Sequence, residues 1–125
     1  MEGMTAELRM RLSAADVHYG GNLVDGAYGL GMFGDVATEL CIRTDGDEGL
    51  FAGYDSVQFL APLRAGDVVE ATATLTRIGT RSRGVSFELR VVCRATPDKG
   101  ASAAEVLTTP VIATQATGTV VVPQA

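Results

Sequence analysis

The stretch of residues 15–40 reads ADVHYGGNLVDGAYGLGMFGDVATEL. Apolar residues in its second half recur every three or four positions, which predicts a helix over residues 22–43. Gly29, Gly31 and Gly34 lie inside that helix, although each interior glycine costs about 1 kcal/mol relative to alanine. We therefore expect neighbouring elements, and in part a second subunit, to approach the helix backbone closely.

The helical spacing divides this segment into two faces. Asn22 is the expected N-cap, and Asp25 falls in the first turn, where a carboxylate favours the positive end of a helix. Asp35 and Glu39 stand one turn apart on the less apolar face, so the core does not need them. That face also carries Tyr28 and Met32, and the broad apolar face carries Leu23, Ala27, Leu30, Phe33, Val36, Ala37, Leu40 and Cys41.

Most of the remaining chain alternates with a period of two, which indicates strands. Strands are expected over residues 6–12, over residues ending at 60, and over 68–78, 85–94 and 106–122, with Pro110 marking an edge or a bulge. One helix and a mostly antiparallel sheet pack most economically when the sheet curls around the helix. The sequence therefore predicts an α+β fold, one domain over residues 1–125, with a five-stranded antiparallel sheet wrapped around one long helix.

Composition excludes several classes of function. A net charge of −5 argues against a nucleic-acid partner, and no apolar run approaches the roughly 18 residues that a membrane span requires. The N-terminal residues lack the pattern of a signal peptide, and Cys41 and Cys93 fall in apolar patterns, which fits reduced thiols in the cytoplasm. One histidine and two distant cysteines make no metal site. The 46% hydrophobic content predicts an oligomer.

One motif is set aside. Residues 29–34, GLGMFG, fit the spacing G-x-G-x-x-G of dinucleotide-binding folds. That fingerprint requires a strand before it and the start of a helix within a parallel βαβ unit. Here the motif lies in the middle of the expected helix, and the strands that follow it are antiparallel in pattern. Helix packing explains these glycines better.

Four segments together resemble the hot-dog family of acyl-coenzyme A enzymes: HYGGNLVDGA (18–27), FGDVATEL (33–40), DGDEGLF (45–51) and YDSVQFLAPLRAGDVVEA (54–71). The resemblance covers roughly residues 8–122. The fourth segment is common to many hot-dog thioesterases, whereas the first two look like the narrower branch of β-aminoacyl-CoA ammonia lyases, which includes the 3-aminobutyryl-CoA enzyme of lysine fermentation and its β-alanyl-CoA relative. Thioesterases of this fold usually carry Gly-Gly where this chain has Asp25 and Gly26.

The resemblance implies an activity and an assembly. It implies reversible elimination of ammonia from a substrate such as 3-aminobutyryl-CoA, giving a 2-enoyl-CoA such as crotonyl-CoA. Coenzyme A is then part of the substrate, and no separate cofactor is expected. Hot-dog enzymes form dimers whose sheets join edge to edge, with two acyl-CoA sites at the interface. We therefore expect a homodimer at minimum, and a hexamer of three dimers is the larger assembly considered.

The chemistry requires a base, a stabiliser for the enolate oxygen and an acid for the departing amine. The resemblance implies that backbone N–H groups at the helix N-terminus polarise the thioester carbonyl, and Gly20, Gly21 and Asn22 are the expected groups. His18 lies beside this turn and is a candidate for a hydrogen bond to the substrate. For Asn22, capping of the helix is the alternative role.

Three carboxylates are candidates for acid–base work. Asp35 and Glu39 are the first choice for the proton shuttle, because a carboxylate in an apolar cleft can have its pKa raised toward neutrality and also complements an ammonium group. Asp25 is the second choice for contact with the amine. Each has a plain alternative, since Asp35 and Glu39 fit a solvated face and Glu39 fits an ion pair with Arg43.

The turn TRSRG supplies Arg81 and Arg83 as candidates for the phosphates of coenzyme A, with ordinary surface charge as the alternative. Two other functions remain open on the same scaffold. One is an acyl-CoA thioesterase in which Asp35 activates water, and the other is a non-catalytic acyl-CoA-binding subunit. The sequence does not distinguish which acyl group is used.

Overall fold

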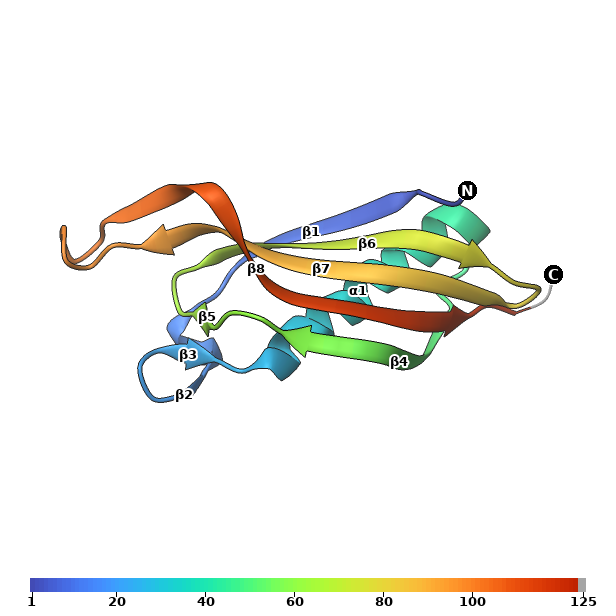
Figure 1. The fold of residues 1–125 in the computed structure, drawn as a ribbon, viewed down its shortest axis with the longest axis horizontal. Coiled ribbons are helices and arrows are strands. Elements are labelled where there is room, and N and C mark those ends of the chain that lie inside the picture. Colours follow the sequence, from blue (N-terminus) through green and yellow to red (C-terminus); the bar gives the residue numbers. More distant parts are fainter. Residues whose placement is uncertain (124–125) are drawn as a thin grey trace.

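The computed structural model describes residues 1–123, and its elements follow one another from the N-terminus to the C-terminus as drawn in Figure 1. They are β1 (Thr5–Arg11), the short 3-10 helix η1 (Ala14–Asp16), β2 (Val17–Tyr19), β3 (Leu23–Val24), α1 (Gly26–Asp45), β4 (Leu50–Phe59), β5 (Leu63–Arg64), β6 (Val68–Ile78), β7 (Ser82–Ala95) and β8 (Ala104–Val121).

The main sheet has five antiparallel strands in the order β1-β6-β7-β8-β4, and α1 runs along one face of it (Figure 1). This confirms the predicted sheet and the single long helix. In β6 and β7 the alternate residues Val69, Ala71, Leu89 and Val91 are buried under the helix. The residues between them lie on the outer face, so the period of two in the sequence reports the two faces correctly.

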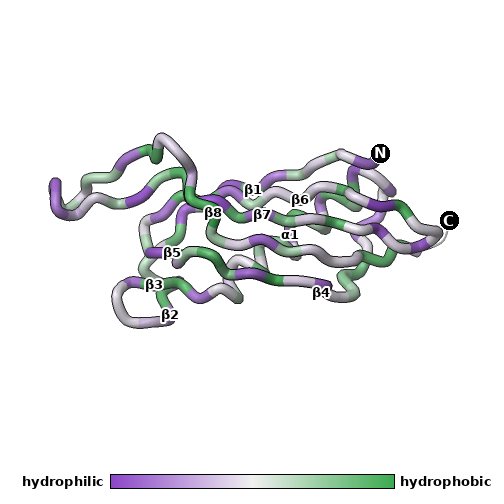
Figure 2. The backbone as a smooth tube through the Cα atoms, viewed as in Figure 1, coloured by the Kyte–Doolittle hydropathy of each residue, from purple (hydrophilic) through white to green (hydrophobic). Residues whose placement is uncertain are grey.

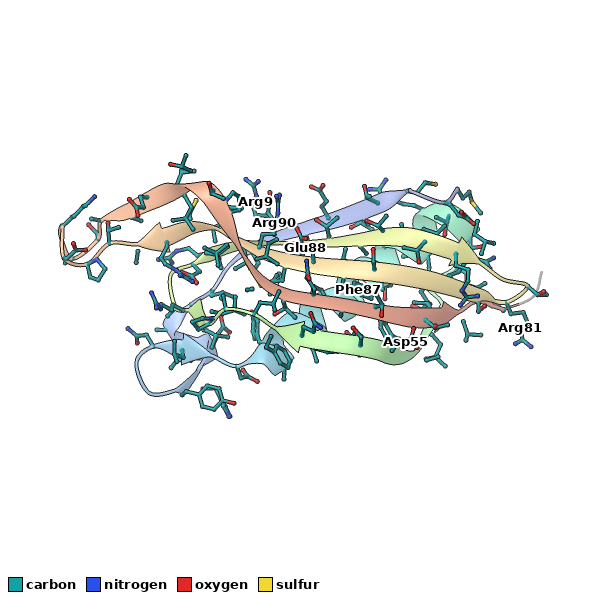
Figure 3. The ribbon with its side chains drawn as sticks, in the orientation of Figure 1. Arg9, Asp55, Arg81, Phe87, Glu88 and Arg90 are labelled. Atoms are coloured by element: carbon teal, nitrogen blue, oxygen red, sulfur yellow. The ribbon has the colours of Figure 1, made fainter. Side chains whose placement is uncertain are left out.

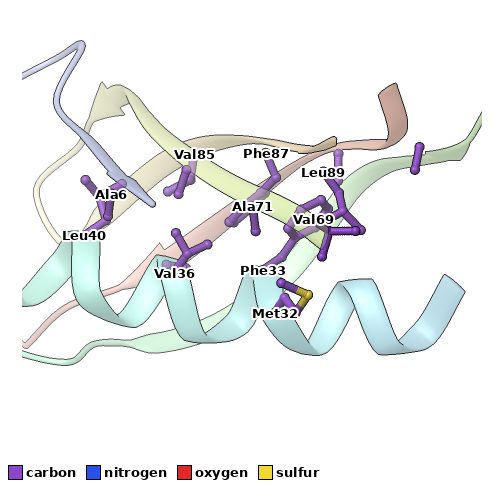
Figure 4. Close-up of a cluster of buried hydrophobic side chains, with 14 of the residues drawn as sticks. Ala6, Met32, Phe33, Val36, Leu40, Val69, Ala71, Val85, Phe87 and Leu89 are labelled. Carbon is purple, nitrogen blue, oxygen red and sulfur yellow. The ribbon is translucent and has the colours of Figure 1, made fainter. Parts of the chain in front are cut away.

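The buried face of α1 differs from the predicted one near its start. Phe33, Val36 and Leu40 point toward the sheet as expected, but Met32 joins them and is fully buried (Figure 4). Ala27, expected inside, is exposed. The first turns of α1 bury the 29 and 32 positions, while Leu30 packs against the core and stays partly exposed.

Of the three interior glycines of α1, packing within the protomer requires only one. A Cβ on Gly29 would lie 2.8 Å from Leu89 Cδ2, which is closer than side chains pack, so the close approach of the sheet requires glycine there. At Gly31 and Gly34 a Cβ would meet nothing within 4 Å. Packing within one protomer therefore explains Gly29 and leaves the other two glycines without an internal reason.

A second, smaller sheet of order β2-β3-β5 was not predicted. Leu23 and Val24, expected to begin the helix, instead form β3 and pair with Arg64 and Leu63 of β5. The apolar residue Leu23 satisfies either a helical or an extended pattern, and only the pairing with β5 decides between them. This small sheet lies beside the first turn of α1 (Figure 1).

The hairpin of β7 and β8 extends beyond the rest of the sheet as an arm (Figure 1). Pro110 lies where the regular pairing is interrupted, because Val91 pairs with Val111 but Cys93 pairs with Val106. The expected irregularity at this proline is confirmed. Of the two free cysteines, Cys41 is buried and Cys93 is half-buried. Among residues 1–123 no helix is long and apolar enough to span a membrane.

Candidate active site

The N-cap of α1 lies three residues later in the structure than the sequence predicts. Gly20, Gly21 and Asn22 form the turn between β2 and β3, and Asn22 adopts the left-handed conformation with φ 61°. The prediction of Asn22 as N-cap is therefore wrong, and Asp25 is the N-cap. Asparagine favours left-handed turn positions as well as helix caps, so the sequence alone cannot separate the two roles.

This turn is tied to the loop that carries β5. The Ala65 N–H donates to the Asn22 carbonyl at 2.9 Å, and a buried ion pair fixes the loop from the other side. Arg94 donates to both carboxylate oxygens of Asp67, at 3.0 and 2.8 Å, and to the Pro62 carbonyl at 3.1 Å. Asp67 also accepts the Arg64 N–H at 2.9 Å and is fully buried. Charge-assisted bonds of this kind hold the loop in one position beside α1.

A hollow of about 600 Å³ opens between the first turn of α1, the small sheet and the end of β4. Figure 2 shows apolar sequence in the segment that joins β4 to β5, which forms one wall of this hollow. Its volume falls within the range of small-molecule sites. It is lined by Tyr19, Leu23, Val24, Asp25, Gly26, Ala27, Leu30, Phe59, Leu60, Ala61, Pro62, Leu63 and Thr114.

Asp25 is the single carboxylate in this lining. Its side chain makes no capping hydrogen bond to the helix, so both oxygens are available to a ligand. The Tyr28 N–H bonds back to the Asp25 carbonyl at 3.2 Å, whereas Gly26 and Ala27 stand at the positive end of the helix, where N–H groups have no partner within the helix. The hollow thus combines an apolar wall, one carboxylate and a helix N-terminus.

Asp35 and Glu39 lie elsewhere in the protomer. Asp35 is on the exposed outer face of α1 and does not line the hollow. It stands about 15 Å along the helix axis from Asp25, at 1.5 Å per residue. The Arg43 Nε donates to Glu39 Oε2 at 2.8 Å, which is the surface ion pair that the sequence left open as an alternative. One protomer therefore does not bring these acids to the hollow.

The residues predicted to contact the substrate beside the β2–β3 turn also lie outside the lining of the hollow. His18 packs edge-on against Tyr19, with ring centroids 4.7 Å apart, and Tyr19 rather than His18 lines the hollow. Gly20 and Gly21 lie at the tip of the β2–β3 turn and also stay outside the lining. The N–H groups at the start of α1 are those of Gly26 and Ala27, not those of this turn.

The two arginines are separated from the hollow by the length of the sheet. Arg83 is buried and donates to Asp45 at 2.7 Å and to the carbonyls of Gly79 and Ser82 at 2.8 and 2.9 Å. It holds the end of α1 to the β6–β7 turn, and these bonds occupy its guanidinium group within the protomer. The Asp45 carboxylate has its pKa lowered, chiefly by these bonds from Arg83. Arg81 is exposed at the tip of the same turn, at the far end from β2 and β3 (Figure 3).

Sequence reasoning missed the aromatic and apolar walls. Phe59 and Leu60 are exposed for 59% and 54% of their surface, and Tyr19 for 57%, although all three line the hollow. Tyr54 is half-buried, its hydroxyl donates to the Leu30 carbonyl at 3.2 Å, and burial raises its pKa. Periodicity reports which face of a strand is buried, but not that the end of β4 meets a helix terminus.

Comparison with known proteins agrees with this fold. Residues 20–93 match the family model of the thioesterase superfamily. The 3-aminobutyryl-CoA ammonia lyase of Acetoanaerobium sticklandii is 52% identical over 121 residues, which cover 97% of this chain and 96% of that protein. The solved β-alanyl-CoA:ammonia lyase from Clostridium propionicum is 34% identical, with a TM-score of 0.93 over 99% of this chain and 88% of that one.

A more distant solved structure shares the fold alone. The hexameric hotdog-fold thioesterase of Campylobacter jejuni has a TM-score of 0.78 at 17% identity, covering 94% of this chain and 81% of that one. The two ammonia lyases are much more similar in sequence, at 52% and 34% identity, and the similarity extends over nearly the whole chain. The chain therefore belongs to the thioesterase superfamily and, within it, to the family that contains these two ammonia lyases.

Proposed function

We propose that this protein is a β-aminoacyl-CoA ammonia lyase that acts reversibly between 3-aminobutyryl-CoA and crotonyl-CoA. Membership in the ammonia-lyase family supports the reaction class. The observation that carries the proposal is the apolar hollow at the helix N-terminus with Asp25 as its single carboxylate. A short acyl chain with an ammonium group fits such a lining, whereas a plain acyl chain has no use for the charge.

The reaction assigns a task to each part of the hollow. The thioester oxygen accepts hydrogen bonds from the N–H groups of Gly26 and Ala27, and the positive end of α1 stabilises it as it becomes an enolate oxygen. A base removes the proton from the carbon beside the thioester, and the electron pair forms the double bond as the carbon–nitrogen bond breaks. Asp25 holds the ammonium group before it departs as ammonia. Coenzyme A enters as part of the substrate, so no separate cofactor takes part.

Asp35 is proposed as the base, supplied by a second copy of the chain. Two features support this assignment: its carboxylate is exposed, and it has no place in the hollow of its own protomer. β4 is the outer strand of the sheet, bonded only to β8 on one side, so a second β4 can join it there. Two copies related by a two-fold axis at this edge would run their helices antiparallel, with each helix near the hollow of the other.

The assembly proposal is a homodimer at minimum, with a hexamer of three dimers as the larger form. In the dimer, Arg81 of the second copy is the proposed contact for a phosphate of coenzyme A. His18 and the turn of Gly20, Gly21 and Asn22 are proposed at the rim, beside Tyr19. A cytoplasmic location is part of the proposal, and the free thiols of Cys41 and Cys93 support it.

Mixing two inactive variants tests whether the site is shared. Asp25→Asn and Asp35→Asn should each lower the turnover of crotonyl-CoA amination by at least about 100-fold. If Asp35 acts in the hollow of the second copy, subunit exchange between the two variants should restore about a quarter of wild-type activity, because half of the dimers then hold one intact site. Glu39→Gln is the matched control and should change turnover little, because Glu39 pairs with Arg43.

Two results would contradict the assignment. Wild-type rates in Asp35→Asn would remove it from the chemistry, and Asp25 would become the next carboxylate to test as the base. No recovery on mixing two inactive variants, with exchange verified by mass spectrometry, would confine both acids to one protomer. Hydrolysis is the second candidate function, favoured by the superfamily. It is separated by assaying release of free coenzyme A from butyryl-CoA, which a lyase does not catalyse.

A further inference from the structure

The ring of Phe59 packs directly on the first residue of α1. If Gly26 carried a Cβ, that atom would overlap the ring, with three ring atoms closer than side chains ever approach. Gly26 has an ordinary helical backbone, not a left-handed one, so its conformation does not require glycine. With the ring in this rotamer, the contact with Phe59 leaves no room for a side chain at position 26.

The backbone fixes the ring in this place. Phe59 is the last residue of β4 and pairs with Thr114 of β8. The next two N–H groups, of Leu60 and Ala61, both donate to the Ala113 carbonyl, at 2.8 and 3.2 Å. These bonds fix the backbone of Phe59 beside α1, so the ring can leave Gly26 only by a change of its side-chain rotamer. Phe59 thus lines the hollow from a fixed backbone position, with 59% of its surface exposed in the protomer.

The position of this wall limits the length of an acyl group. Resting on the proposed function, the substrate is anchored at Gly26 and Ala27 through its thioester oxygen and at Asp25 through its ammonium group. The ring touches Gly26, so it lies against one of the residues that anchor the thioester and next to Asp25, the anchor of the ammonium group. Carbon atoms beyond the amine-bearing carbon must therefore meet the ring almost at once.

We propose that Phe59 is the specificity-determining residue of the hollow and restricts it to β-aminoacyl groups of about four carbons. A methyl group on the amine-bearing carbon fits against the ring face, while a longer chain is excluded by it. The pair of Phe59 and Gly26 acts as a unit, because the wall reaches its position only where the helix carries no Cβ.

Substrate-length profiles of variants test this role. We would measure kcat/KM for ammonia addition to crotonyl-CoA and 2-hexenoyl-CoA in wild type, Phe59→Leu and Phe59→Ala. One methylene is worth 10- to 200-fold in such pockets, so Phe59→Ala should raise the hexenoyl-to-crotonyl ratio by at least about 30-fold, with Phe59→Leu between. Gly26→Ala should lower crotonyl-CoA turnover by displacing the ring, and Phe59→Ala in the same chain should relieve that loss.

Val106→Ala is the control for loss of an exposed apolar side chain, because Val106 is 78% exposed and pairs with Cys93 in the β7–β8 arm. Its ratio should stay within about threefold of wild type. A hexenoyl-to-crotonyl ratio of kcat/KM in Phe59→Ala that stays within about threefold of the wild-type ratio would overturn the proposal.

Binding of butyryl-CoA and hexanoyl-CoA can be measured by calorimetry without turnover. It therefore tests the role of Phe59 in chain-length specificity separately from the lyase function. A shift toward hexanoyl-CoA in Phe59→Ala, in a protein that aminates no enoyl-CoA, would keep the role of Phe59 and reject the lyase. If Phe59→Ala aminates crotonyl-CoA but neither its kcat/KM ratio nor its binding ratio shifts toward the longer chain, the lyase stands and the role of Phe59 is rejected.

Discussion

At the scale of single residues, two arginine–carboxylate pairs connect parts of the chain that are far apart in sequence. Arg83 bonds Asp45 and joins the end of α1 to the β6–β7 turn, and Arg94 bonds Asp67 and fixes the loop of β5. Neither pair takes part in the proposed chemistry. Both are partly or fully buried, so loss of one partner leaves an unpaired charge in the protein.

Removing the Asp67 carboxylate should be costly for this reason. Asp67→Ala leaves Arg94 and the Arg64 N–H without their partner, and we expect the free energy of unfolding to fall by about 3–5 kcal/mol in urea titrations. Asp98→Ala, in the exposed loop between β7 and β8, is the control and should change it by less than about 0.5 kcal/mol. A loss below about 1 kcal/mol for Asp67→Ala would refute the structural role of the pair.

The pairs also predict how stability depends on pH. Arg83 lowers the pKa of Asp45, and Arg9, followed by Arg90, lowers the pKa of Glu70. The stabilisation is fully present above the unfolded pKa of about 4, and it is lost as the pH falls through the lower folded pKa. Urea titrations from pH 6 to pH 3 should therefore show falling stability, with a shallower fall in Asp45→Asn. An equally steep fall in that variant would exclude Asp45 as a source.

At the scale of elements, the interior glycines of α1 supply a matched comparison. Gly29→Ala should lower the free energy of unfolding by about 1 kcal/mol or more, because overpacking against Leu89 outweighs the gain in helix propensity. Gly31→Ala meets no atom within the protomer and should gain up to about 1 kcal/mol. Equal losses in both variants, independent of protein concentration, would contradict this account of the helix.

The elements also show what the sequence could predict. Strict alternation in β6 and β7 identified the buried faces correctly, and spacing placed Phe33, Val36 and Leu40 on the sheet. The start of α1 was misplaced because Leu23 and Val24 suit a helix as well as the short ladder with β5. The ion pair of Arg83 could not be predicted, because its partner, Asp45, is 38 positions away and only the fold brings them together.

For the site, the sequence supplied the residue types but not their arrangement. Asp25 was among the expected acids, and it alone of them lines the hollow. Phe59 and Leu60 carry no signal in the periodicity, since their importance comes from where β4 ends relative to α1. Asp35 was identified from its helix face, and whether it meets a substrate depends on a second copy, which no pattern within one chain specifies.

At the scale of the whole molecule, the outer strand β4 and several exposed apolar side chains favour association. Leu50, Phe59 and Leu60 are all more than half exposed at or next to this strand. The outer edge of such a strand presents free backbone N–H and C=O groups and apolar side chains, to which a strand of another chain can pair. Sedimentation equilibrium at micromolar concentration should give a dimer or a multiple of it. A monomer would remove both the assembly and the shared site.

The most direct test of the central claim is the amination of crotonyl-CoA. Purified protein, crotonyl-CoA and ammonium would be incubated together, and the products separated by mass. We predict 3-aminobutyryl-CoA with coenzyme A still attached, formed at a rate that falls at least about 100-fold in Asp25→Asn, and the reverse elimination when 3-aminobutyryl-CoA is supplied. Release of free coenzyme A without any aminated thioester would contradict the account and identify a hydrolase.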